Sequence, residues 1–181
     1  MKLHPLYKRL MLLLIVIGPF FWLVFTTDGQ RRVDLVLLSL WRGGATMDVA
    51  FAKLREDARE SDLRGSFPDV PLSCEDRTNP FGNRICTAPI ASFNGAPASY
   101  AVAYFDAGRL TALKLAYRRP YHDYVGQQLL LELGQPVSDD AGVWRWSAGD
   151  GLVLLPVQPP AREEPTVLWL SRRQALQAAA Q

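Results

Sequence analysis

Residues 10–27 carry no charged side chain, and this stretch constrains the chain more than any other. It reads LMLLLIVIGPFFWLVFTT, and its 18 residues are about the shortest apolar segment that can cross the hydrocarbon core of a membrane. A helix buried in an ordinary globular domain normally keeps a polar stripe, and this segment has none. The stretch therefore predicts a membrane-spanning helix or a signal sequence.

The flanking residues predict the orientation of this segment. Lys2, Lys8 and Arg9 precede it and Asp28 follows it directly, and basic residues are held on the cytoplasmic side. A cleavable signal peptide has a shorter apolar core and small residues before the cut, which the sequence VFTT does not supply. We therefore expect an uncleaved transmembrane signal anchor at residues 10–27.

This anchor would divide the chain into a cytoplasmic tail at residues 1–9, the membrane segment, and an exported domain at residues 28–181. We expect a single-pass protein of the bacterial inner membrane, with a cytoplasmic N-terminus and a periplasmic C-terminal domain. The chain has 20 basic and 18 acidic residues, and the tail takes three of the basic residues and none of the acidic ones. The exported part is therefore nearly neutral, and we expect no nucleic-acid partner, because that class needs a basic face.

Cys74 and Cys86 are the only cysteines in the chain. A thioredoxin-like redox pair needs Cys-x-x-Cys, a zinc site needs more ligands than this chain offers, and the acidic residues between the two cysteines lack the spacing of a calcium loop. Disulfides persist in an oxidising compartment. We predict a structural disulfide that closes a solvated loop, and we expect no metal or other cofactor.

Two runs of secondary structure follow one another along the predicted domain. Residues 31–40 fit either a short helix, which we favour, or a buried strand. Met47, Phe51 and Leu54 mark one face of a longer helix at residues 46–60. Strict alternation in SYAVAYF and RLTALKLAY, around Gly108, predicts a hairpin. Asn94-Gly95 predicts the turn before it, and Gly134 predicts the end of the helix that follows it. The full order is a helix at 46–60 and three strands at about 85–118, then a helix at 121–133 and three strands at about 142–171. This order predicts an α+β domain of tandem helix-plus-antiparallel-sheet repeats, at about residues 31–118 and 119–171. We expect its strands to form either one antiparallel sheet or two joined sheets, with the helices packed on one face.

Two short motifs resemble a known family. The stretch GGATMDVAFAKL, residues 43–54, is similar to the Gly-x-Thr opening of a helix in the BamE-type lipoproteins, and LLLELGQP, residues 129–136, is similar to the Leu-Gly-x-Pro that ends such a helix. These proteins share an architecture with the β-lactamase inhibitor protein. The resemblance implies two tandem helix-plus-sheet repeats and a class of small envelope domains that work by binding other proteins.

No catalytic motif is evident. Tyr121, His122 and Asp123 are adjacent on the second predicted helix, so the histidine and aspartate do not face one another, and the chain has no Gly-x-Ser-x-Gly. We expect this helix start to face solvent and the protein not to be an enzyme.

The aromatic residues leave two interpretations open. Tyr117, Tyr121, Trp144 and Trp146 either pack in the core beneath the helices or form an exposed interaction patch. The leading hypothesis is a membrane-anchored, non-catalytic adaptor or assembly domain that binds an envelope protein. The alternative is a domain that binds glycan or peptidoglycan through the tryptophans.

Overall fold

The computed structural model describes residues 5–26, 29, 32–33, 36–37, 44–137 and 142–179, and its main feature is one sheet of nine strands. The strands pair in the order β1-β4-β5-β6-β9-β8-β7, and β3 also pairs with β5 and carries β2 at its outer side. The sheet is mixed, because β1 and β4 are parallel while the other pairs are antiparallel. The strands are β1 Thr46–Met47, β2 Ser73–Asn79, β3 Gly82–Pro89, β4 Ser92–Phe93, β5 Ala96–Asp106, β6 Arg109–Tyr117, β7 Val143–Ala148, β8 Gly151–Pro156 and β9 Thr166–Ser171.

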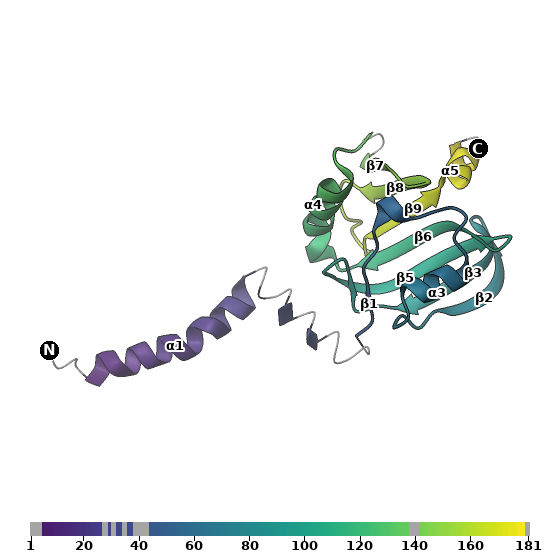
Figure 1. The fold of residues 1–181 in the computed structure, drawn as a ribbon. Helices are drawn as coiled ribbons and strands as arrows, with labels where there is room; N and C mark the ends of the chain where they lie inside the picture. Colours follow the sequence, from purple (N-terminus) through teal and green to yellow (C-terminus); the bar gives the residue numbers. More distant parts are fainter. Residues whose placement is uncertain are drawn as a thin grey trace.

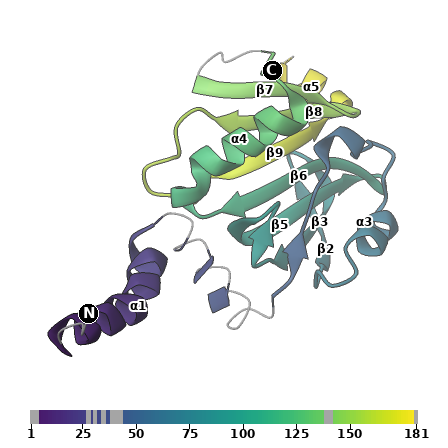
Figure 2. The same ribbon diagram turned by 60° about the vertical axis from the view of Figure 1, so that its left-hand side comes forward.

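The two faces of the sheet are covered unequally. The 3-10 helix η1 (Phe51–Lys53), α3 (Glu60–Ser66) and α4 (His122–Leu133) lie on one side, which we call the covered face (Figures 1 and 2). A second 3-10 helix, η2 (Arg119–Tyr121), leads into α4. On the other side, which we call the open face, the described chain places only α5 (Arg172–Ala179), and α5 contacts β8, β9 and β6 at one end of the sheet.

The hydrophobic core lies on the covered face. Trp146, Trp169 and Leu155 project from the strands into this core and are at most 1% exposed. Gly151 lets the sheet close tightly there, because a Cβ at this position would lie 2.7 Å from the ring of Trp169. Alternation along the strands therefore sends one set of side chains into a packed core and the other set to the open face.

The predicted helix at residues 46–60 is wrong. The segment forms β1, then η1, and only its last residue belongs to α3. Met47, Val49 and Phe51 are buried while the residues between them are exposed, so the apolar side chains follow the period of two of an extended chain. Met47 and Phe51, together with Leu54, also fit a period of 3.6, which is why the sequence indicated a helix.

The predicted tandem repeats are also wrong. Strands β6 and β9, which were expected in different repeats, pair directly, with Leu113 opposite Trp169. Residues 73–79, expected to be part of a loop, form β2. The chain therefore builds one continuous mixed sheet, in which backbone hydrogen bonds between β6 and β9 join the two predicted repeats.

The transmembrane anchor predicted at residues 10–27, and with it the single-pass inner-membrane placement, is contradicted. Among the described residues, no helix has the length and apolar character needed to cross a membrane. Helix α1 (Pro5–Phe25) takes in Lys8 and Arg9 at its start and ends two residues before the predicted segment does. Its uncharged part, residues 10–25, is about 24 Å long at 1.5 Å per residue, against about 30 Å for a hydrocarbon core.

Several local predictions are confirmed. The β5–β6 hairpin turns at Ala107 and Gly108, and Asn94 and Gly95 connect β4 to β5, all four with positive φ. Helix α4 ends at Leu133, directly before Gly134, as its sequence indicated. The predicted short helix at residues 31–40 lies mostly outside the described residues.

Candidate functional site

Cys74 and Cys86 form the predicted disulfide. They occupy directly opposite positions on β2 and β3, with Cα atoms 4.0 Å apart. Cys86 is fully buried and Cys74 is half-buried. The disulfide therefore links the two strands of the outer hairpin of the sheet. The segment that was expected to be a solvated loop forms these two strands.

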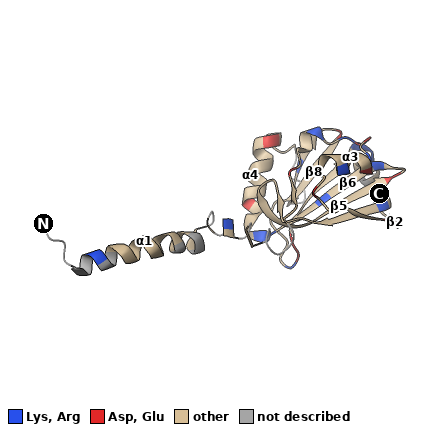
Figure 3. Cartoon of the chain, turned by 60° about the horizontal axis from the view of Figure 1, so that its bottom comes forward, with Lys and Arg blue, Asp and Glu red and all other residues tan. Residues whose placement is uncertain are grey.

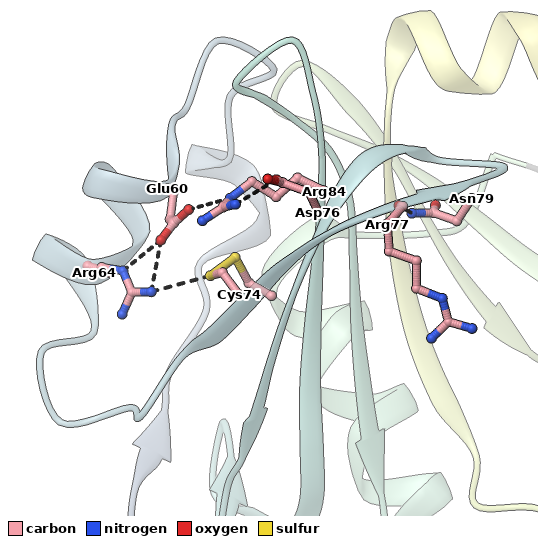
Figure 4. A network of polar contacts seen from close by, with 8 residues as sticks. Glu60, Arg64, Cys74, Asp76, Arg77, Asn79 and Arg84 are labelled. Atoms are coloured by element: carbon pink, nitrogen blue, oxygen red, sulfur yellow. Dashed lines mark hydrogen bonds and ion pairs between the residues drawn. A yellow bond between two sulfur atoms is a disulfide. The ribbon is translucent and has the colours of Figure 1, made fainter.

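A chain of ion pairs joins α3 to this hairpin (Figure 4). Glu60 accepts hydrogen bonds from Arg64 at 2.8 Å and from Arg84 on β3 at 2.9 Å, and Arg84 also binds Asp76 on β2 at 2.6 Å. The Arg64 guanidinium lies 3.3 Å from the sulfur of Cys74. Hydrogen bonds from Arg64, and then from Arg84, lower the pKa of Glu60 below its ordinary range.

This cluster fixes α3 rather than offering a metal site. A Glu60 carboxylate oxygen and the two cysteine sulfurs lie within 4.8 Å of one another. However, the sulfurs are bonded to each other and only a thiolate is an effective ligand. The carboxylate is in turn occupied by two guanidinium groups. The arrangement therefore holds one helix against one edge of the sheet.

Of the two interpretations of the aromatic residues, the structure supports packing in the core. Tyr117, Tyr121 and Trp146 are buried, at 0%, 6% and 1% exposure, and Trp144 is half-buried. Trp144 and Trp146 lie on the covered face beneath α4, where Gly126 leaves room for the Trp144 ring. Helix α4 covers these rings, so these four residues form no exposed aromatic platform for a glycan.

His122 is likewise buried, at 4% exposure, and the expectation that the start of this helix faces solvent is wrong at this residue. Its Nδ1 lies 2.8 Å from the hydroxyl of Tyr117, and its Nε2 lies 3.3 Å from the carbonyl of Val157. Burial raises the pKa of Tyr117, so its hydroxyl remains a donor. The pair satisfies polar groups inside the core, and Asp123 points elsewhere, exposed on the first turn of α4.

The open face is the surface that the fold leaves available. Its side chains stand in three rows across the strands, and most are apolar or aromatic and half-buried or exposed. The central row is Thr87, Val102, Lys114, Leu168, Leu154 and Arg145, and the flanking rows include Ile85, Tyr104, Leu152, Tyr100 and Thr166. Charge gathers on turns, helices and strand ends, while β5 and β6 are uncharged along most of their length (Figure 3).

Lys114 occupies the middle of this face. It lies opposite Val102 on one side and Leu168 on the other. It is half-buried, and it makes no ion pair or hydrogen bond with any other residue that the structure describes. A lysine without a partner in the middle of an apolar surface is a position at which a second molecule can supply an acceptor.

The sequences of β8 and β9 contain an indication of this site that the sequence analysis did not use. Leu152, Leu154 and Leu168 alternate with buried Val and Trp residues, so their strands are apolar on both faces. An antiparallel strand with one face in water alternates apolar with polar residues. Two apolar faces on these antiparallel strands therefore indicate a second surface to be covered.

A groove of about 510 Å³ lies apart from the open face. It runs between α3 and residues 48–58, which we call the strap and which connect β1 to α3.

In comparisons of the chain with protein families, curated proteins and solved structures, nothing matched. The resemblance to BamE-type lipoproteins therefore stays a prediction, and the function is argued from the surfaces alone.

Proposed function

We propose that this protein is a non-catalytic interaction domain that binds a partner protein on its open face. The observation that carries the proposal is Lys114, a half-buried and unpaired cation in the middle of an apolar sheet face. Protein interfaces typically combine an apolar, aromatic-rich centre with a few charged groups that fix the register. The open face has both parts.

The charges on this face favour an acidic partner over a second copy of the chain. The central row carries Lys114 and Arg145 and no carboxylate. A twofold pairing would set this row against itself and bring like charges together. A partner that presents a carboxylate within an apolar patch would instead pair with Lys114 while covering Leu154 and Leu168.

Site-specific photo-crosslinking of the full chain in its natural host tests the proposal. A photoreactive residue in place of Leu154 is expected to give a discrete adduct with another protein, and one in place of Gln127, exposed on α4, is expected to give none. Lys114→Glu should abolish the Leu154 adduct and Lys114→Met should reduce it, because reversal adds repulsion to the loss of the ion pair. Equal adducts at both positions, or an adduct unchanged by Lys114→Glu, would contradict the proposal.

A further inference from the structure

The groove between the strap and α3 has the size of a ligand site. Its volume of about 510 Å³ falls within the range of roughly 300–1,000 Å³ that is typical of small-molecule and cofactor pockets. The residues that line the groove belong to the strap and to α3, which lie on the covered face (Figure 1), so it is a different surface from the open face and does not depend on the function proposed above.

The floor of the groove is apolar. Val49 and Leu63 are buried beneath it, and Leu54 and Phe67 are half-buried along it. An apolar floor that remains partly exposed in the folded chain gains free energy when a side chain of a ligand covers it. The groove therefore suits an apolar side chain.

The walls are fixed before any ligand binds. Asn94 accepts a hydrogen bond from the N–H of Val49 at 2.7 Å and donates one to the carbonyl of Val49 at 2.9 Å, which holds the start of the strap. Leu110 donates its N–H to the carbonyl of Ala58 at 2.8 Å, which holds the end. The ion pair between Glu60 and Arg84 of β3 holds α3 on the opposite side. A preformed site binds its ligand without the entropic cost of ordering the walls.

The charges on the rim favour a cationic ligand. Arg55 and Asp57 are paired by two hydrogen bonds of 2.9 and 3.0 Å and neutralise each other. Asp48 makes no ion pair with any described residue, and Asp62 caps α3 by accepting the N–H of Arg59. Lys53 is the one other cation among the lining residues, so the two carboxylates outnumber it and the unpaired charge of the rim is negative.

We propose that this groove binds a peptide segment in which an apolar side chain stands next to a lysine or arginine. The apolar side chain covers Leu54 and Phe67, and the cation lies between Asp48 and Asp62. Lys53 weakens the attraction, so the site discriminates by charge only moderately.

Blocked dipeptides provide the probe for this site. Acetyl-Phe-Arg-amide, acetyl-Phe-Glu-amide and acetyl-Gly-Arg-amide are titrated into the full chain, and their dissociation constants are measured by ligand-observed NMR. Exposed ion pairs change a binding constant by up to about fivefold each. We expect Phe-Arg to bind about fivefold more tightly than Phe-Glu, and Gly-Arg to bind more weakly than Phe-Arg.

Variants of the rim separate binding from folding. Asp48→Asn with Asp62→Asn should reduce the preference for Phe-Arg over Phe-Glu to about twofold or less. Asparagine keeps an oxygen that can accept the N–H of Arg59, and Asp69→Asn, exposed outside the groove, is the matched control. Lys53→Met should act in the opposite direction and tighten Phe-Arg, which a loss of structure could not do. The proposal is overturned if no dipeptide binds at millimolar concentration, if Phe-Glu binds as well as Phe-Arg, or if the rim variants leave the preference unchanged.

Discussion

The two faces of one sheet show how the same strands serve stability and recognition separately. On β8, Val153 and Leu155 are fully buried beneath the covering helices, whereas Leu152 and Leu154 stand half-buried on the open face. The side chains are nearly identical in chemistry. What differs is whether the chain itself supplies a second layer, so the covered face stabilises the fold and the open face is left for a partner.

The largest expected difference between the two faces comes from truncating two neighbouring leucines of β8. Leu155→Ala should destabilise the protein by about 2–5 kcal/mol, because it leaves a cavity in a packed core. Leu154→Ala should cost less than about 1.5 kcal/mol, since its site is already open to solvent. Denaturant unfolding of both variants measures the difference. Equal losses would mean that the open face is packed as tightly as the covered one.

Removing the disulfide tests how much of the stability of the fold depends on the covalent link between β2 and β3. The bridge joins residues separated by 12 positions, and the loop-closure argument gives it about 3 kcal/mol. Replacing Cys74 and Cys86 together by alanine should lower the free energy of unfolding by about that amount. The wild type, fully reduced and with its thiols quantified, should match the double variant. A reduced protein as stable as the oxidised one would show that the ion pairs of Glu60 hold the hairpin alone.

Removing one tyrosine hydroxyl from each face should give a smaller difference in stability. Tyr117→Phe leaves Nδ1 of buried His122 without its hydrogen-bond partner, and it should cost about 1–3 kcal/mol. Tyr100→Phe, on the open face, should change stability by less than about 0.5 kcal/mol. Thermal unfolding of the two variants under identical conditions gives the comparison. A large effect at Tyr100 would indicate that the open face has an internal role.

The smallest expected effect is the pH dependence of stability that comes from the ion pairs of Glu60 with Arg64 and Arg84. The pKa of Glu60 in the folded protein lies below its ordinary value of 4.5, because Arg64 and then Arg84 donate hydrogen bonds to the carboxylate. The stabilisation is therefore present above pH 4.5 and is lost as pH falls through the folded-state pKa. Glu60→Gln should remove this acid-side loss, by less than about 1 kcal/mol for so exposed a group. Stability measured from neutral to acidic pH in both proteins should converge at the acidic end, and parallel curves would contradict the assignment.

Local chemistry explains which parts of the fold the sequence could predict. Alternation in β5 and β6, the Asn94-Gly95 turn and the Gly134 stop after α4 are each determined within about ten residues, and each was predicted. Strand β2 was missed because it is an edge strand, polar on nearly every side chain, and has no apolar face to reveal it.

Long-range contacts explain the rest. Nothing near Trp146 or Tyr121 in sequence says that α4 and the strap cover the same face of the sheet, so their burial could not be read from the strand pattern. The disulfide was predictable because only one pair of cysteines exists. Lys114 was visible as a charge within an apolar row of β6, but its meaning depends on Leu168 and Leu154, which reach it only through the register of three strands.

Chemical labelling of Lys114 tests the central claim most directly. A lysine-reactive ester is applied to the purified full chain and to the same chain in cells of its natural host, and the modification of Lys114 is quantified by mass spectrometry against that of Lys8, which is exposed on α1. If the open face binds a partner, labelling of Lys114 relative to Lys8 falls several-fold in cells and recovers in the purified protein. If the ratio is the same in both settings, the open face is not a docking surface.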